Sequence, residues 1–212
     1  GDNDNNMIIG NEIYNNDRQG IFIGYQDASK ISTDNVIESN VVYNNGLYTY
    51  ANGPDASAYG IQLWVADSNA IKNNEIYGHD DWFPYPDYYP TFDFAQGIYL
   101  CDSNDNTVIN NYLHDNNYGV GLWHPARLLG NNHINYNKIA LNTGYGVYNY
   151  DGIQVDARFN WWGSATGPTH SSNLGGMGDA ISNNVDYSPW LGFVVGTSPM
   201  TWHVNPTGAP GA

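Results

Sequence analysis

Asparagine and aliphatic residues recur together along the chain at fixed offsets. Five Asn residues each have one aliphatic residue three positions before them and another two positions after them. These anchors are Asn11, Asn40, Asn74, Asn111 and Asn137. A further Asn stands five positions before every anchor and five positions after each, except that His79 follows Asn74. Polar and apolar columns of this kind predict a solenoid in which each repeat adds one coil.

A second anchor is a Gly followed by an aliphatic residue, with a further aliphatic residue two positions later. It occurs at Gly20, Gly60, Gly97, Gly119 and Gly146, and Asn149 breaks the last apolar column. Such alternation indicates short strands with one face turned inward. The shortest repeat, from Asn137 to Asn160, is 23 residues, and no sustained helical period is present. We predict an all-β fold, a single-stranded right-handed parallel β-helix of about six coils.

The Asn columns have a physical reason in this fold. Equivalent residues of successive coils lie one strand spacing apart, about 4.8 Å. At that distance an inward amide can donate to one neighbour and accept from the other, which continues the hydrogen-bond ladder through the turns. The sequence therefore predicts buried Asn ladders, with Asn40 and Asn74 in one of them, beside aliphatic columns that fill the bore.

Residues 5–191 resemble the Asn-rich right-handed parallel β-helix repeats of the pectate-lyase-like superfamily, found in microbial surface proteins and polysaccharide-active enzymes. The most specific motifs are Asn160-Trp161-Trp162-Gly163 and Tyr187-Ser188-Pro189-Trp190-Leu191. The resemblance implies that these motifs close the end of the bore. That superfamily includes lyases, hydrolases, epimerases and non-catalytic scaffolds, so the fold alone assigns no chemistry.

Composition narrows the possible partners. The chain has 6 Lys and Arg against 21 Asp and Glu, a net charge of -15, which disfavours nucleic acid and anionic membrane surfaces. No apolar run is long enough to insert into a bilayer. Polarity comes mainly from amides and phenols, which suits an extracellular or cell-surface location. Cys101 is the only cysteine, so an internal disulfide is excluded, and we expect a buried, unreactive thiol.

Aromatic residues gather on the outward positions of the Gly-anchored strand and in two loop insertions on the same face, at 46–59 and 80–96. The predicted carbohydrate-binding residues are Trp64, Tyr99, Trp123, Tyr148, Tyr150, Trp82 and Tyr85. Aromatic rings stack on the apolar faces of sugars, so glycan binding is one interpretation. Two alternatives are that the insertions cover this face, or that another subunit does.

Candidate chemistry is limited to carboxylates near the third-coil insertion. They are Asp80, Asp81, Asp87, Asp93 and Asp102. A hydrolase needs two such groups across a groove, but Asp in polar loops is more often solvated or a Ca²⁺ ligand. We therefore name no catalytic residue and give Asp80 and Asp81 as a possible calcium site. His79 could join a metal site, although replacement of a ladder Asn is the simpler interpretation.

The leading functional hypothesis is a non-catalytic extracellular scaffold, a surface or filament-forming protein with a glycan-binding face. The rival is a polysaccharide hydrolase or lyase acting along the same face. Residues 1–191 form the predicted β-helix, and 192–212 a C-terminal tail with strand-like segments that lack a repeat partner. If the tail pairs with the first coil of another molecule, the contact is head-to-tail and produces filaments.

Overall fold

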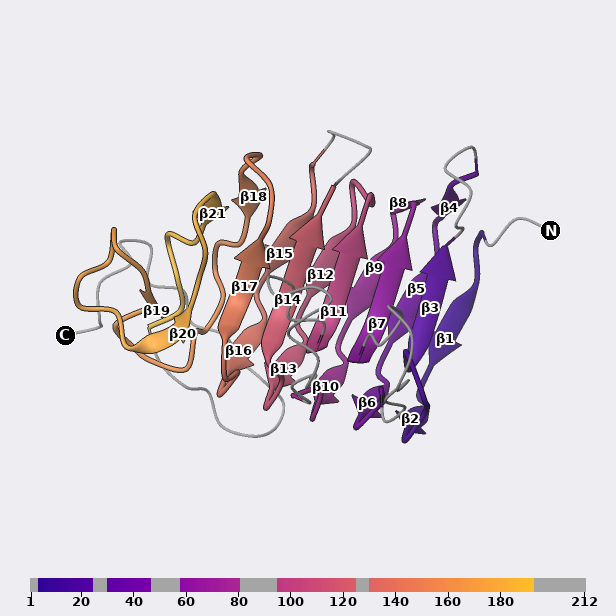
Figure 1. Ribbon diagram of the computed structural model, residues 1–212. Coiled ribbons are helices and arrows are strands. Elements are labelled where there is room, and N and C mark those ends of the chain that lie inside the picture. Colours follow the sequence, from indigo (N-terminus) through magenta and orange to yellow (C-terminus); the bar gives the residue numbers. More distant parts are fainter. Residues whose placement is uncertain (1–3, 25–29, 47–57, 81–94, 125–129, 193–212) are drawn as a thin grey trace, which may run out of the picture.

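The computed structural model describes residues 4–24, 30–46, 58–80, 95–124 and 130–192, and these contain strands and no helix (Figure 1). Short strands stack side by side along one axis, from β1 at one end to β19–β21 at the other. Every pairing between named strands is parallel, and in the three main sheets the pairs join equivalent positions of successive coils. The structure confirms the predicted parallel β-helix.

Three parallel sheets make the walls. Sheet A contains, in order, β1 (Met7–Ile9), β5 (Val36–Glu38), β9 (Ala70–Lys72), β12 (Thr107–Ile109), β15 (His133–Asn135), β18 (Val155–Asp156) and β21 (Val185–Asp186). Sheet B contains β2 (Glu12–Tyr14), β6 (Val41–Tyr43), β10 (Glu75–Tyr77), β13 (Tyr112–His114) and β16 (Lys138–Ala140). Sheet C contains β3 (Ile21–Gly24), β7 (Ala58–Trp64), β11 (Ala95–Cys101), β14 (Tyr118–Trp123) and β17 (Tyr145–Asn149). Two minor pairs are β4 (Ser32–Thr33) with β8 (Ala66–Asp67), and β19 (Pro168–Thr169) with β20 (Gly178–Ala180).

The bore is filled by the aliphatic columns that the repeat predicts. Ile37, Ile71 and Val108 of sheet A pack with Leu63, Leu100 and Leu122 of sheet C in one continuous core. The Gly anchors of sheet C are required by close packing of successive coils. A Cβ on Gly97 would lie 2.8 Å from the carbonyl oxygen of Gly119, so no larger residue fits without a shift of backbone.

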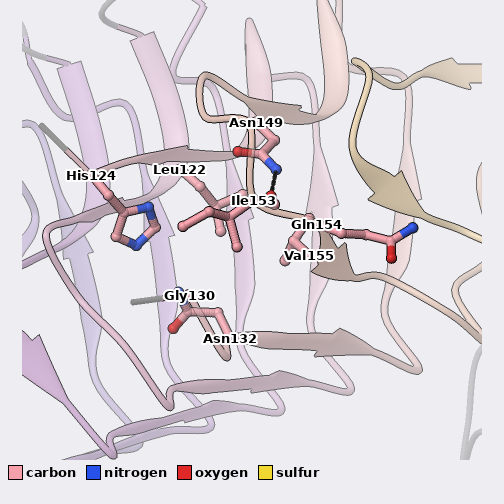
Figure 2. Close-up of a pocket in the computed structure, with 8 residues that line it drawn as sticks. All are labelled: Leu122, His124, Gly130, Asn132, Asn149, Ile153, Gln154 and Val155. Atoms are coloured by element: carbon pink, nitrogen blue, oxygen red, sulfur yellow. Dashed lines mark hydrogen bonds between the residues drawn. The ribbon is translucent and has the colours of Figure 1, made fainter. Parts of the chain in front are cut away.

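Asn149 breaks the apolar column because it closes the turn at 149–153 (Figure 2). It occupies the inward position next to Leu122. Its Nδ2 donates to the carbonyl oxygens of Ile153 at 2.7 Å and Asn184 at 3.1 Å, and its Oδ1 accepts the backbone N–H of Asp151 at 3.0 Å. One polar side chain thus holds the last turn of the bore against the closing segment.

Three Asn ladders run along the corners between the sheets. In each, one Oδ1 accepts two N–H groups of the preceding coil, the backbone N–H and the side-chain Nδ2 of the equivalent Asn. Asn74 Oδ1 accepts both from Asn40, at 2.9 and 3.0 Å, and Asn74 donates in the same way to Asn111. Nδ2 of Asn74 also donates to the carbonyl oxygens of Ile37 and Lys72, both at 3.0 Å. The predicted ladder containing Asn40 and Asn74 is confirmed, and both residues are buried.

A left-handed backbone residue stands directly before each ladder position except Asn132 and Asp179. The φ angles of these residues lie between 50° and 71°. Most are Asn, Asp, Ser or Gly, for which this conformation is least costly, but Tyr136, Leu141 and Phe159 adopt it too. The rings of Tyr136 and Phe159 stack at 5.2 Å, which offsets part of their cost. The left-handed residue turns the chain at the corner so that the next side chain points inward.

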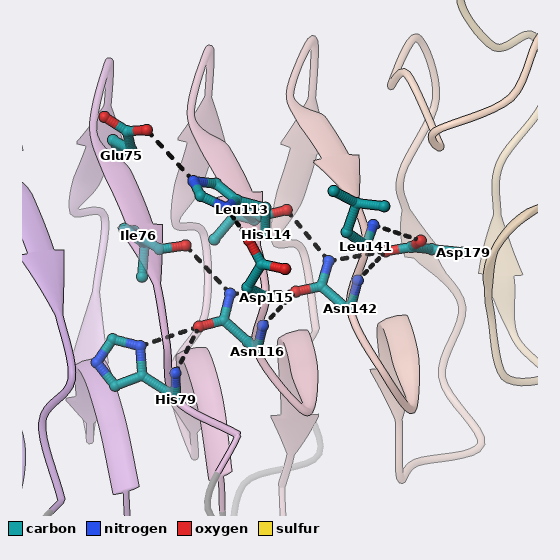
Figure 3. A network of polar contacts seen from close by, with 10 residues as sticks. All are labelled: Glu75, Ile76, His79, Leu113, His114, Asp115, Asn116, Leu141, Asn142 and Asp179. Atoms are coloured by element: carbon teal, nitrogen blue, oxygen red, sulfur yellow. Dashed lines mark hydrogen bonds and ion pairs between the residues drawn. The ribbon is translucent and has the colours of Figure 1, made fainter.

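His79 takes the place of Asn in the third ladder, between Asn45 and Asn116 (Figure 3). Its Nδ1 lies 2.9 Å from Asn116 Oδ1, which can only accept, so Nδ1 carries the proton. Its Nε2 lies 3.3 Å from Asn45 Nδ2 and accepts from it. The neutral imidazole therefore reproduces the donor and acceptor of an Asn amide, and burial lowers the pKa of His79 to about 4.

Asp179 ends the third ladder with acceptors only (Figure 3). Its Oδ2 accepts the backbone N–H and Nδ2 of Asn142 at 3.0 and 2.8 Å, and its Oδ1 accepts the backbone N–H of Leu141 at 2.9 Å. Burial raises the pKa of Asp179, although these N–H donors oppose the rise. A carboxylate can accept hydrogen bonds from the preceding coil but has no N–H group to donate to a following one.

The closing motifs cover this end of the bore. Trp162 is fully buried within the continuous core, Leu191 is 1% exposed, and Tyr187 and Trp190 pack against the core from its edge. Asn160 completes the second ladder by accepting from Asn137. Residues 193–212 lie outside the described residues, so assembly through the tail stays a prediction.

Replacing Asn74 with Leu is expected to lower the free energy of unfolding by about 3 kcal/mol, because buried N–H groups of Asn40 and carbonyl groups of Ile37 and Lys72 lose their partner. Chemical denaturation measures this change. The control is Asn131→Leu at an exposed position with one hydrogen bond to Asp105, which should cost less than about 1 kcal/mol. Equal losses in the two variants would contradict a special role for the ladder.

The free energy of unfolding is expected to fall by about 3 kcal/mol as the pH drops from 6.5 to about 4. In this window the imidazole of His79 is protonated in the unfolded chain but stays neutral in the folded protein, where it is buried. His79→Asn keeps the ladder and removes this titration. Unfolding curves of the two proteins should therefore diverge across this window, with the natural protein losing more stability. Parallel pH profiles would show that His79 is not held neutral.

Candidate functional site

The outer face of sheet C carries two columns of side chains that point away from the bore. The register aligns Phe22, Gln62, Tyr99, Gly121 and Tyr148 in one column. It aligns Gly24, Trp64, Cys101 and Trp123 in the other. Leu63, Leu100 and Leu122 alternate with these residues and enter the core. The inward and outward assignment made from the sequence is therefore confirmed.

A second buried cluster lies outside the bore on this face. It consists of Tyr59, Tyr99 and Cys101, and Trp64 and Trp123 pack against it while remaining partly buried. The rings of Tyr59 and Tyr99 are 4.7 Å apart. The side chain of Tyr99 is only 7% exposed, so it packs beneath its neighbours and offers little surface to a ligand. The two Trp side chains are thus fixed from beneath and keep an accessible portion.

Tyrosines extend the aromatic surface over β14 and β17. Tyr148 stacks on Tyr118 at 5.2 Å, meets Tyr145 edge-on at 4.7 Å, and lies 4.4 Å from Tyr150 between ring centroids. Tyr148 and Tyr150 are neither fully buried nor fully exposed. With Trp64 and Trp123 they define what we call the aromatic face. Trp82 and Tyr85, also predicted to bind carbohydrate, lie outside the described residues.

The five strands of sheet C contain no charged residue. Three of the cationic side chains that the structure describes are engaged on the other sheets. On sheet A, Lys72 pairs with Glu38, which the strand register places opposite it, at 3.1 Å, and Arg158 pairs with Asp156 at 2.8 Å. On sheet B, Lys138 lies 3.6 Å over the ring of Tyr112. The strands that carry the aromatic face are therefore uncharged, on a strongly acidic protein.

Ionisable groups border sheet C where its strands end. Buried His124, which follows β14, has its Nδ1 at 2.5 Å from Asp151 Oδ2 and its Nε2 at 3.0 Å from the carbonyl oxygen of Ser103. The ring is thus held on both sides, by a side-chain carboxyl group of the next coil and by a backbone carbonyl group of the preceding one. His124 also lines a small hollow together with Leu122, Asn149, Ile153 and neighbouring residues (Figure 2). This pair joins three successive coils at the border of the face.

Asp151 and His124 were not among the candidate residues that the sequence supplied. No repeat signal marks Asp151, because it follows the position where Asn149 breaks the pattern. Of the predicted carboxylates, Asp102 is 5% exposed and Asp80 is exposed. Asp81, Asp87 and Asp93 lie outside the described residues. The structure therefore brings a His and a carboxylate together where the sequence indicated only separate acids.

The proposed calcium site is described only in part. Asp80 follows His79, but the ring of His79 is occupied on both nitrogens by the ladder. Among the described residues, no group of three or more His, Cys, Asp or Glu side chains is arranged to hold a metal ion. Because Asp81 lies outside them, calcium binding by Asp80 and Asp81 stays a prediction.

A row of stacked rings on sheet B was missed. Tyr14, Tyr43, Tyr77 and His114 stack with centroids 4.9, 5.0 and 4.9 Å apart and nearly parallel planes. The sequence contains the pattern that predicts this row, since each of the four rings stands three positions after an Asn anchor. His114 is bracketed by Asp115 at 2.7 Å and Glu75 at 3.3 Å (Figure 3). Because these rings cover one another's faces, they offer mainly edges to a ligand.

Cys101 lies between Trp64 and Trp123 in its column, and burial raises the pKa of its thiol to about 12. Burial also raises the pKa of Tyr99. The expected unreactive thiol thus agrees with its surroundings, because a thiol is nucleophilic only after ionisation.

In the folded protein, Cys101 is expected to resist a disulfide reagent such as dithionitrobenzoate at pH 8, because it is buried and protonated. In guanidinium chloride it should react at the rate of a free thiol. The release of thionitrobenzoate, followed by absorbance, measures both rates. Equal rates would show that the cluster around Cys101 opens freely.

No helix in the described parts of the chain is long and apolar enough to cross a membrane. A search of curated proteins found no match to the sequence. The family model described as the right-handed beta helix region matches residues 48–161, more than half of the chain. Together with the stacked parallel sheets, this match shows that the chain belongs to the right-handed beta helix family.

Proposed function

We propose that the protein is a non-catalytic extracellular scaffold that binds a glycan through the aromatic face of sheet C. The observation that carries this proposal is the placement of Trp64 and Trp123, partly buried on a cluster of Tyr59, Tyr99 and Cys101 and surrounded by uncharged strands. Rings held in this way meet the apolar face of a sugar with little loss of side-chain freedom. Preorganised aromatic residues of this kind favour binding.

The solenoid supports a scaffolding role. Its rigidity derives from ladders that join every coil to the next, and its walls place side chains at regular intervals on a long surface. The low content of cationic residues favours an extracellular or cell-surface setting over contact with nucleic acid or membranes.

The rival proposal is a polysaccharide hydrolase or lyase acting along the same face. Its support is the border of sheet C, where Asp102, His124 and Asp151 lie at the ends of three successive strands. Against it, Asp102 is buried and Asp151 is bound to His124. A glycan array combined with a polysaccharide-turnover screen on the folded protein separates the two. Binding without turnover supports the scaffold, and new reducing or unsaturated ends support the enzyme.

Trp123→Ala is expected to lower glycan affinity about tenfold, the usual effect of removing a central aromatic contact, while the β-sheet circular dichroism signal is retained. Tyr14→Ala is the matched control, because Tyr14 is an exposed aromatic residue of sheet B outside the aromatic face. It should leave affinity unchanged. Loss of affinity in the control alone would move the binding surface to sheet B.

A further inference from the structure

Building on the proposed glycan-binding role, we infer that the ligand is a linear, uncharged glycan that runs along the helix axis and stacks alternate sugar rings on Trp64 and Trp123. The inference deepens the proposed function by naming the class of glycan, its direction on the protein and the number of sugar rings between the two contacts. It rests on the register of sheet C, on the distribution of charge and on the shape of the column between the two Trp residues.

The register fixes the direction and the period. Trp64 pairs with Cys101, and Cys101 pairs with Trp123, so the two Trp residues stand two strand spacings apart along the helix axis. Two spacings amount to about 9.6 Å. That length is close to a disaccharide unit of an extended β-linked glycan. A chain laid along the axis therefore brings every second ring to a Trp.

The side chain between the two Trp residues is recessed. Cys101 is small and 3% exposed, whereas both Trp side chains retain accessible surface. The column thus has two raised aromatic positions with a low position between them. An intervening sugar ring can pass over Cys101 without stacking, as expected for a ligand with a two-ring period.

The charge distribution selects against acidic glycans. The strands of sheet C contain no Lys or Arg to pair with a uronate or sulfate group. The whole chain carries a net charge of -15. An anionic polymer stacked on these strands would be repelled by the acidic protein and would find no cationic side chain on the strands themselves, whereas an uncharged polymer would not be repelled.

Affinity electrophoresis of the full chain tests the charge class with matched polymers. The uncharged probes are hydroxyethylcellulose, galactomannan and arabinoxylan, and the charged probes are carboxymethylcellulose, alginate and polygalacturonate. Retardation by at least one uncharged polymer and by no charged polymer is the expected result. Retardation by charged polymers alone would overturn the inference and leave the proposed glycan binding intact. Absence of binding to both classes, and to a glycan array, would overturn the proposed function itself.

Calorimetry with oligosaccharides of the bound polymer tests the two-Trp geometry. A disaccharide reaches one Trp and a trisaccharide reaches both, so affinity should rise about tenfold at the third ring. Trp64→Ala and Trp123→Ala should each abolish this step. Phe22→Ala, an exposed aromatic residue of the neighbouring column, should keep it. A step that is absent from the natural protein, or that survives both Trp substitutions, overturns the axial arrangement.

Discussion

The structure depends on one repeated interaction, an inward amide oxygen that accepts two N–H groups from the coil before it. Each Asn Oδ1 receives a backbone and a side-chain N–H of the preceding Asn, at 2.8–3.1 Å in the first two ladders except where Asn160 accepts at 2.7 Å. These contacts satisfy polar groups at the corners, where the sheets leave the backbone without strand partners. They also fix the separation of coils at one strand spacing. The same distance suits the hydrogen bonds of the sheets and the packing of side chains in the bore.

The side chains that depart from the ladder show what it requires. His79 can replace Asn because a neutral imidazole has one donor and one acceptor, as an amide does. Because the imidazole must stay neutral, this replacement makes the folded protein sensitive to acid. Asp179 is accepted only at the end, because a carboxylate receives N–H groups without donating. Asn149 enters the apolar column where a turn and the closing segment need hydrogen bonds. In each case the donors and acceptors of the substituted side chain match those of the neighbouring groups at that position.

The same spacing gives the outer faces their different properties. On sheet B it brings Tyr14, Tyr43 and Tyr77 to stacking distance, so their faces are used within the protein. On sheet C the column of Trp64 and Trp123 has the small residue Cys101 between the two rings. These two Trp side chains are therefore only partly buried and do not stack on each other. A regular backbone can thus present either a closed row of rings or a set of separated binding positions.

The sequence by itself determined the parallel β-helix, the composition of the ladders and the inward or outward direction of Trp64 and Trp123. These properties follow from local alternation and from repeat offsets, both of which are visible along one chain. It did not reveal the left-handed residues before the ladder positions as a class, because Tyr136, Leu141 and Phe159 stand there beside Asn and Gly.

Only the tertiary structure decided how accessible each outward residue is and which ionisable groups meet. Tyr99 and Trp123 are both outward aromatic residues in the sequence pattern, yet Tyr99 is buried among Tyr59 and Cys101 whereas Trp123 is only partly covered. His124 and Asp151 meet because coils bring the ends of neighbouring strands together, although 27 residues separate them in the chain. Burial and the pairing of charges depend on neighbours from other coils. The spacing of one residue type along the chain does not specify these neighbours.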